Sequence, residues 1–284
     1  MKLGLNLLVI GGFIRPDDYA TLQRIKDAGY DGVEIPVFSG APRDYATLSH
    51  VLDELALERT AVTIIPDVEQ SPVNPDARAR MKARDRLRWA VDCIHVLGGT
   101  VMAGPYHSPL GVFTGNGPSD DETKHLAEVL HETAGYASQA GVALSIEPLN
   151  RFECYMLNTL QQAAKLRALV GHENFSFMYD SFHANIEERD MVAGLREYAG
   201  QITHIHISEN DRGIPGRGHI PWRAVFDAIK ASGYEGWLTV EAFGRGVPEL
   251  AAATRVWRDL FPDLPTLIDE SIGFLRAEWA RASQ

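Results

Sequence analysis

Cysteine is scarce in this chain, with Cys93 and Cys154 alone among 284 residues. Neither lies in a CxxC pair, and a disulfide framework or a cysteine zinc site needs such pairing or close spacing. We therefore expect both thiols to be small buried apolar side chains. A chain of this length can bury a large core without crosslinks.

Long apolar runs are also missing, because no stretch reaches the 18 apolar residues of a membrane-spanning helix. The first residues, MKLGLNLLVIGGF, have the single lysine and short apolar run of a signal peptide. They continue directly into PDDYATLQRIKDAGY without a small-residue cleavage region. We interpret residues 3–9 as a first strand and expect a cytoplasmic protein.

Positive charge is in deficit, with 27 Lys and Arg against 38 Asp and Glu and a formal net charge of −11. Nucleic-acid phosphates and anionic membranes attract clustered Lys and Arg. The charge balance therefore argues against a nucleic-acid or membrane partner. The apolar share of 45% is that of an ordinary soluble globular protein.

What the sequence does contain is a regular alternation of short apolar runs and longer helical patterns. The runs predict strands at 3–9, 32–36, 60–65, 100–103, 142–147, 175–180, 202–208 and 237–242. Helical patterns follow at 16–28, 45–57, 76–97, 120–140, 159–170, 190–199 and 222–232, with further helices from 248 onward. Eight such units predict an α/β chain folded as a (β/α)8 TIM barrel.

An open doubly wound sheet is the alternative architecture. It would normally carry a GxGxxG phosphate turn after the first strand, whereas this chain has VIGGFIRP there. No linker or internal repeat divides the sequence, so we predict a single domain over residues 1–284.

An additional C-terminal helix is predicted at about 266–282. Ile268, Ile272, Leu275 and Trp279 follow helical spacing there. This apolar face can pack on its own barrel or form an interface between subunits.

Polar side chains stand at the ends of the last four predicted strands, which are otherwise apolar. The strand ends carry Glu147, Asp180, His206 and Glu241. In a TIM barrel the carboxyl ends of the strands meet at one mouth, where catalytic groups lie. Crowded carboxylates repel one another, and a divalent cation removes that repulsion. The alternative is that each group is an ordinary strand end or ion-pair partner.

Oxygen ligands with one imidazole suit Mn²⁺ or Mg²⁺, and Co²⁺ is also possible. Four protein ligands would leave two positions of an octahedral ion for adjacent substrate oxygens. Of the two histidines on the seventh strand, His206 is nearer the strand end and is the predicted ligand. His204 lies one pleat deeper and could orient a ligand instead.

Four segments, SIEPLNRFE, YDSFHANIEE, HIHISENDRGIPGRGHIPW and TVEAF, resemble the ketose 3-epimerases of the xylose isomerase-like sugar isomerases and epimerases. That group includes the D-tagatose, D-psicose and L-ribulose 3-epimerases. The resemblance implies one divalent ion, usually Mn²⁺, held by Glu147, Asp180, His206 and Glu241. It also implies that Glu153, His183 and Arg212 bind the O1/O2 end of a ketose, and that the chain forms a homodimer or homotetramer.

Inversion at C3 of a ketose requires removal of a weakly acidic C–H proton and its return from the opposite face. A divalent ion beside O2 and O3 polarises the carbonyl and stabilises the enediolate charge. Two acid/base groups are needed, one for each face, and Glu147 and Glu241 can fill these roles.

The ends of the early strands should form the wall around the distal sugar carbons. The candidates are Asn6, Leu8, Phe38, Ile65, Pro66, Gly104 and Tyr106. A mostly apolar wall makes few stereospecific hydrogen bonds, so we expect several ketopentoses and ketohexoses as substrates. A free ketose is favoured over a sugar phosphate, although the loop DRGIPGRGH after the seventh strand has the glycines and arginines of a phosphate site.

Three other functions are compatible with parts of this pattern. An aldose–ketose or hydroxypyruvate-type isomerase would use a similar metal site. A DNA-repair nuclease of the endonuclease IV type would need more histidines and a basic groove. A sugar-binding barrel without catalysis would not need both glutamates.

Overall fold

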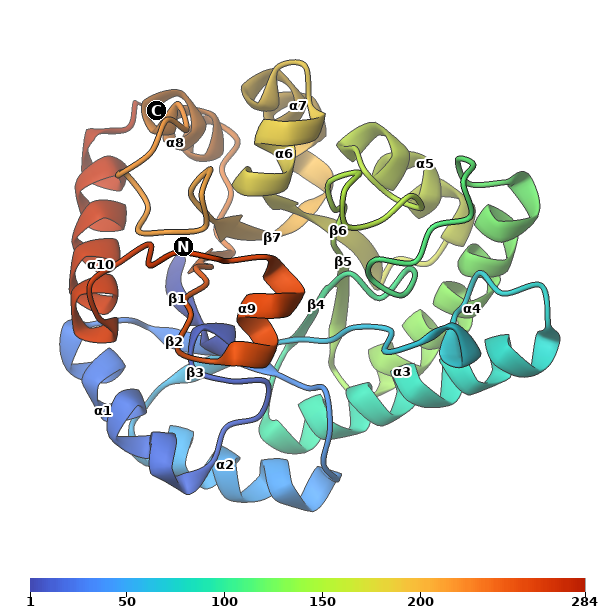
Figure 1. The fold of residues 1–284 in the computed structure, drawn as a ribbon, viewed down its shortest axis with the longest axis horizontal. Helices are drawn as coiled ribbons and strands as arrows, with labels where there is room; N and C mark the ends of the chain where they lie inside the picture. Colours follow the sequence, from blue (N-terminus) through green and yellow to red (C-terminus); the bar gives the residue numbers. More distant parts are fainter. Residues whose placement is uncertain (284) are drawn as a thin grey trace.

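Eight parallel strands pair in sequence order and close into a barrel in the computed structural model, which describes residues 1–283 (Figure 1). The strands are β1 (Lys2–Asn6), β2 (Gly32–Pro36), β3 (Glu58–Val62), β4 (Val101–Gly104), β5 (Ala143–Ile146), β6 (Phe175–Asp180), β7 (Ile202–Ile207) and β8 (Trp237–Val240). β1 pairs with β8, which closes the sheet. The predicted TIM barrel is confirmed, and the open sheet is excluded.

Helices surround the barrel, as a parallel sheet requires for burial of its outer face. They are α1 (Tyr19–Ala28), α2 (Pro42–Glu54), α3 (Ala77–Leu97), α4 (Asp120–Gln139), α5 (Leu160–Val170), α6 (Ser181–Glu187), α7 (Met191–Tyr198), α8 (Trp222–Ala231), α9 (Pro248–Thr254) and α10 (Leu264–Arg281). Capping residues set several of the starts. Ser119 and Thr159, for example, each form a capping box, which satisfies free N–H groups of α4 and α5.

Two elements differ from the sequence-based expectation. The predicted strand at 3–9 ends at Asn6, and Leu7–Val9 form a short 3₁₀ helix. Asn6 causes this turn, because its side-chain oxygen accepts the backbone N–H of Leu8 at 2.8 Å. Helix α6, which was not predicted, starts directly at the end of β6, where Asp180 accepts two backbone N–H groups as its N-cap.

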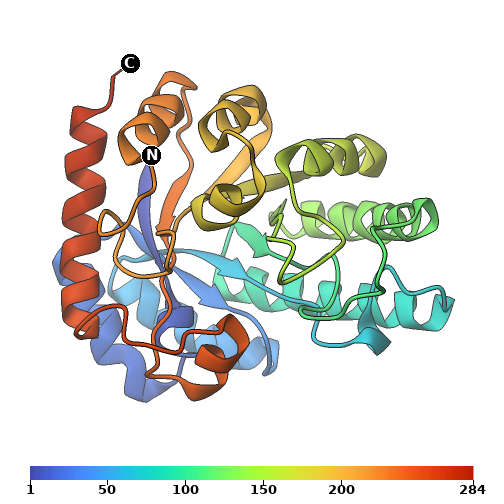
Figure 2. The same ribbon diagram turned by 45° about the horizontal axis from the view of Figure 1, so that its top comes forward.

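Helix α10 runs along the outside of the barrel beside α1 and α8 (Figure 2). Its inward residues Ile268, Ile272 and Leu275 are buried in the same core as the barrel strands. The apolar face therefore packs on its own barrel, which was one of the two alternatives. An oligomer remains a prediction.

The main core lies between the strands and the helical shell, and Cys93 is part of it. Cys154 is also fully buried, so both cysteines are free and inaccessible, as expected. No helix within residues 1–283 is both long enough and apolar enough to cross a bilayer.

Candidate metal and sugar site

Glu147, Asp180, His206 and Glu241 meet at the carboxyl end of the barrel. One ligand atom from each lies within 4.8 Å of the others, and all four side chains are buried. Strand pairing produces this arrangement. Asp180 pairs with His206 across β6 and β7, while the backbone N–H of Glu241 donates to Ile207 in the neighbouring strand.

The orientation of His206 fits a cation at this position. Its Nδ1 atom is buried without a hydrogen-bond partner. It lies 3.4 Å from Glu241 Oε1, 3.5 Å from Asp180 Oδ2 and 3.8 Å from Glu147 Oε1. Three carboxylates around one unpartnered imidazole nitrogen form a donor set suited to a hard divalent ion. The residues present therefore fit the metal that the sequence predicted, while the identity of the ion is not fixed by these contacts.

Arg212 lies beside the cluster and supplies positive charge to it. Its Nη1 atom is 2.6 Å from Glu241 Oε2 and 3.3 Å from Asp180 Oδ2. The guanidinium lies over the ring of Phe182, 3.9 Å from its centroid, which fixes its plane. The backbone of Arg212 is left-handed, with φ of 67°, and is held by hydrogen bonds to Glu209 and Phe243.

His183 is held in one tautomer by the loop after β5. Its Nδ1 atom accepts the backbone N–H of Asn150 at 3.0 Å, so Nδ1 carries no proton. Burial and then Arg212 lower the pKa of His183, which keeps the ring neutral. Its Nε2 atom lies 2.9 Å from the Arg212 Nη2 donor and 3.6 Å from Glu147 Oε1.

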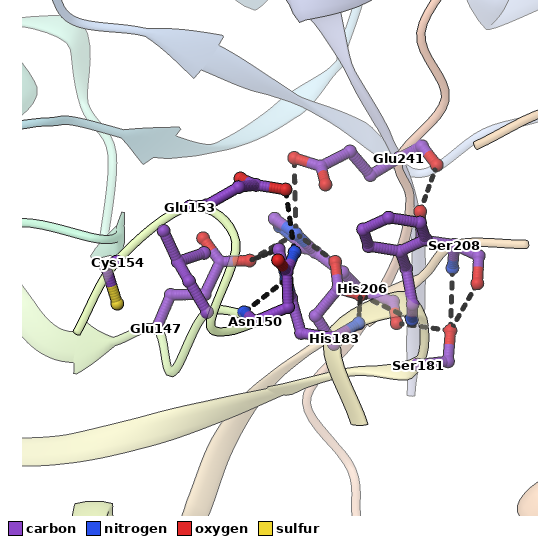
Figure 3. Close-up of polar contacts among 12 residues, drawn as sticks. Glu147, Asn150, Glu153, Cys154, Ser181, His183, His206, Ser208 and Glu241 are labelled. Atoms are coloured by element: carbon purple, nitrogen blue, oxygen red, sulfur yellow. Dashed lines mark hydrogen bonds and ion pairs between the residues drawn. The ribbon is translucent and has the colours of Figure 1, made fainter. Parts of the chain in front are cut away.

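Glu153 enters the site from the same loop. The side-chain amide of Asn150 donates to Glu153 Oε1 at 2.7 Å and also contacts His183 Nδ1. Figure 3 shows the carboxylates of Glu153 and Glu241 approaching one space from different segments, with Asn150 and His183 beside it. The sequence did not indicate Asn150. Its place in EPLNR, three residues after the candidate ligand Glu147, is the signal that could have found it.

The pKa values of the buried carboxyl groups shift in opposite directions. Burial, followed by the nearby Glu241, raises the pKa of Glu147 well above its usual range. Burial would also raise the pKa of Asp180, but the charge of Arg212 and the contacts with the neighbouring histidines outweigh it and lower that pKa. Without a metal, Glu147 thus holds a proton more readily than Asp180.

A cavity of about 120 Å³ opens above the cluster. Glu147, Glu153, His183, Arg212 and Glu241 line one side of it. Its other side is apolar and includes Leu8, Phe38, Val62, Ile64, Pro105, Leu110, Leu149, Phe243, Leu250, Ala253 and Thr254. Helix α9, which lies over the barrel in the view of Figure 1, supplies the last three of these residues.

The predicted distal wall coincides with this cavity only in part. Leu8 and Phe38 line it. Ile65 and Tyr106 are instead buried in the main core, Pro66 is exposed, and Gly104 is tightly enclosed by Val62 and Thr63. Asn6 lies below the cavity and donates to Glu241 Oε1 at 3.0 Å. After β3, the residues that face the cavity are Val62 and Ile64, which precede the predicted Ile65 and Pro66.

Comparison with known proteins identifies the family. Residues 22–278 match the model of the xylose isomerase-like TIM barrels. An L-ribulose 3-epimerase of Mesorhizobium japonicum is 31% identical over 257 residues, covering 90% of this chain and 86% of that protein. A ketose 3-epimerase of Arthrobacter globiformis is 30% identical over 280 residues, covering 97% and 96%.

The chain belongs to the ketose 3-epimerase group of the xylose isomerase-like TIM barrels. A solved structure of an L-ribulose 3-epimerase agrees with this assignment. It superposes with a TM-score of 0.92 at 29% identity and covers 99% of this chain and 95% of its own. The resemblance read from the sequence is confirmed at the level of this ketose 3-epimerase group.

Proposed function

We propose that this member of the ketose 3-epimerase group inverts C3 of free ketoses and depends on a divalent ion, most simply Mn²⁺. The observation that carries the proposal is the meeting of Glu147 and Glu241 from β5 and β8 around one ligand cluster. Two carboxyl groups beside one reacting carbon can serve as the base on one face and the acid on the other.

Glu147, Asp180, His206 and Glu241 would hold the ion. When bound, a divalent ion would polarise the ketose carbonyl and stabilise the negative charge that develops during proton removal. Mg²⁺ and Co²⁺ suit the same donors, and metal reconstitution distinguishes the three.

The proton transfers belong to the two glutamates. One carboxylate removes the C3 proton, and the other carboxyl returns a proton to the opposite face, which inverts the centre. In the metal-free chain Glu147 and Glu241 already differ in their surroundings. Glu241 is ion-paired with Arg212, while the raised pKa of Glu147 favours its protonated form. Such a difference between two carboxyl groups is the usual basis for separate acid and base roles.

His183, Arg212 and Glu153 would bind the O1/O2 end of the sugar. His183 Nδ1 is occupied by the backbone N–H of Asn150, so a substrate oxygen would meet the ring at its Nε2 edge, beside the donors of Arg212. Glu153 can accept a hydroxyl proton. These contacts would fix which face of C3 points at which glutamate.

The cavity supports a free ketose with a loosely recognised distal end. Among residues 1–283, Arg212 and His183 are the basic side chains that line it, and Arg212 is already paired with two carboxylates. A phosphate group would need further donors. The apolar side would accept different hydroxyl configurations, so L-ribulose, D-tagatose and D-psicose are all candidate substrates.

The test is turnover of a ketose panel in D₂O after chelation and readdition of Mn²⁺. We expect the 3-epimer to form with deuterium at C3, and chelation to abolish it. E147Q and E241Q should each lower epimerisation by about 10³-fold or more, because each removes one of two required proton carriers. Only one of the two should still exchange the C3 proton of a given epimer, since the remaining base acts on one face.

E173Q, which changes an exposed glutamate, is the control and should keep full activity. Formation of aldoses in place of the 3-epimer would assign the aldose–ketose isomerase reaction instead. Substantial epimerisation by either glutamine variant would overturn the two-base mechanism.

A further inference from the structure

Glu34 is a fully buried acid in the middle of β2, outside the predicted ligand set. Its sequence context, GVEIP, is otherwise apolar. The side chain reaches across the barrel interior to β7, where Oε1 lies 2.6 Å from His206 Nε2. A buried carboxylate without compensation is costly, so its contacts must account for its position.

Those contacts occupy the whole carboxylate. Oε1 accepts from His206 and from the amide of Asn6 at 2.9 Å. Oε2 accepts from the Thr60 hydroxyl at 3.0 Å, and His204 Nε2 lies 2.8 Å away in an alignment too poor for a regular hydrogen bond. A carboxylate offers about four acceptor positions, and all four face a neighbour here.

The contact with Glu34 determines which nitrogen of His206 carries a proton. An ionised carboxylate at 2.6 Å requires N–H at Nε2. A cation in the cluster requires a neutral imidazole, and a neutral ring with its proton on Nε2 has its lone pair on Nδ1. That lone pair faces Glu147, Asp180 and Glu241, the direction in which a cation would lie.

We propose that Glu34 is the positioning residue of the metal centre, which fixes the ring and tautomer of His206 so that Nδ1 is the ligand atom. His204 and Thr60 hold the second oxygen of Glu34. Asn6 links Glu34 to Glu241, because its amide donates to both carboxylates. This inference rests on the metal site of the proposed function, but not on the reaction.

A second ion between Glu34, His204 and His206 is the competing interpretation, since their ligand atoms also lie within 4.8 Å of one another. The acceptor count argues against it. An ion there would have to displace Asn6 or Thr60 from Glu34, and His206 would have to lose the Nε2 proton. A carboxylate that orients a metal-binding histidine is a common arrangement.

The test measures metal binding, not turnover. Affinity for Mn²⁺ and Co²⁺ is determined by competition with a chelator, and the number of ions per chain is measured directly. We expect one ion per wild-type chain. E34Q should weaken affinity by about 10–100-fold, because the glutamine keeps the size of the side chain but loses its charge. T60V and H204L should each lower metal affinity by less than E34Q does. H204Q keeps a donor near Glu34 Oε2, so its affinity should lie closer to the wild type than that of H204L.

The tautomer is measured separately. Imidazole ¹⁵N shifts of histidine-labelled, metal-free protein are followed to the high pH at which the His206 ring becomes neutral, and should then show the remaining proton on Nε2, assigned by its loss in H206N. In E34Q the ring should become a mixture of tautomers. L130A, which truncates a fully buried residue of α4, is the matched control. It should lower thermal stability without changing metal affinity or the tautomer.

Several results would overturn the proposal. The first is an E34Q variant whose metal affinity and His206 tautomer are both those of the wild type. Two ions in the wild type and one in E34Q would make Glu34 a ligand itself. If E34Q does not fold, unchanged affinity in both T60V and H204L has the same consequence. If the wild type binds no ion, the metal site of the proposed function fails as well, which distinguishes that failure from the others.

Discussion

The two halves of the barrel mouth differ in chemistry, because the charged groups that line the cavity all come from one of them. Strands β5 to β8 and their loops supply the carboxylates, imidazoles and guanidinium of the site. Strands β1 to β4 and their loops supply Leu8, Phe38, Val62, Ile64 and Pro105 to the same cavity. A sugar bound between them would therefore have a polar end held by directed contacts and a distal end against apolar carbon.

This division separates reaction from substrate choice. Directed hydrogen bonds and charges determine where C3 lies and how its proton moves. An apolar wall contributes affinity that depends little on hydroxyl configuration. The early strands still contribute polar groups, but Asn6 and Glu34 lie below the mouth and contact Glu241 and His206, not the cavity.

The largest effect should come from removing positive charge on the polar half. R212L would leave Glu241 and Asp180 without their guanidinium and would remove a predicted sugar contact. We expect kcat/KM to fall by about 10²–10³-fold. Metal-free protein should also lose about 3–5 kcal/mol of unfolding free energy, as broken buried ion pairs do. R212K should recover only part of both losses, because one ammonium cannot occupy the positions of both Nη1 and Nη2.

Kinetics and urea unfolding of the three proteins check this prediction. The control is R217L, since Arg217 pairs with Glu270 on the surface, where ion pairs contribute little. It should change unfolding by no more than about 0.5 kcal/mol. Near-normal kcat/KM in R212L would show that the polar half does not need this charge.

A smaller effect, on the pH dependence of stability, is expected where the loop after β4 meets the loop after β5. His107 follows β4 and is buried, with Nε2 3.1 Å from the backbone oxygen of Glu147. Burial lowers the pKa of His107 from 6.5 to about 3. Between these values the unfolded chain binds a proton that the folded chain does not, so the free energy of unfolding falls as the pH falls below 6.5. The slope is about 1.4 kcal/mol per pH unit.

Urea unfolding of metal-free protein at several pH values between about 7 and about 4.5 measures this slope, because most of this range lies between the two pKa values of His107. H107Q lacks the titrating group and should show a shallower acid slope than the wild type. H50Q, at an exposed histidine, should not. Parallel slopes for wild type and H107Q would contradict the expected contribution of His107.

The contrast between the halves also explains what the sequence could predict. Asp180, His206 and Glu241 interrupt apolar strands at their ends, and strand alternation places such residues at one mouth. The closed barrel followed from eight repeated units. Glu34 interrupts β2 in a similar way, but its partners Asn6, Thr60 and His204 come from three other strands. Their meeting depends on barrel closure, which no local pattern encodes.

The apolar wall was harder to predict for a different reason. One apolar residue looks like its neighbour in sequence, so nothing local separates Ile64, which faces the cavity, from Ile65, which faces the core. A shift of one residue reverses the face. The short 3₁₀ turn after Asn6 similarly depends on a single side-chain hydrogen bond.

The smallest effect should come from the apolar half itself. F38A and L8A each remove part of the wall without touching a ligand or proton carrier. We expect KM to rise about 2–10-fold with little change in kcat, since the lost contacts serve substrate and transition state alike. The rise should be similar for two ketoses that differ only at a distal hydroxyl, such as D-tagatose and D-fructose. M81A, at an exposed site on α3, should leave both constants unchanged. A loss confined to one of the two sugars would show that the wall discriminates configuration after all, and the division between reaction and substrate choice would then fail on its apolar side.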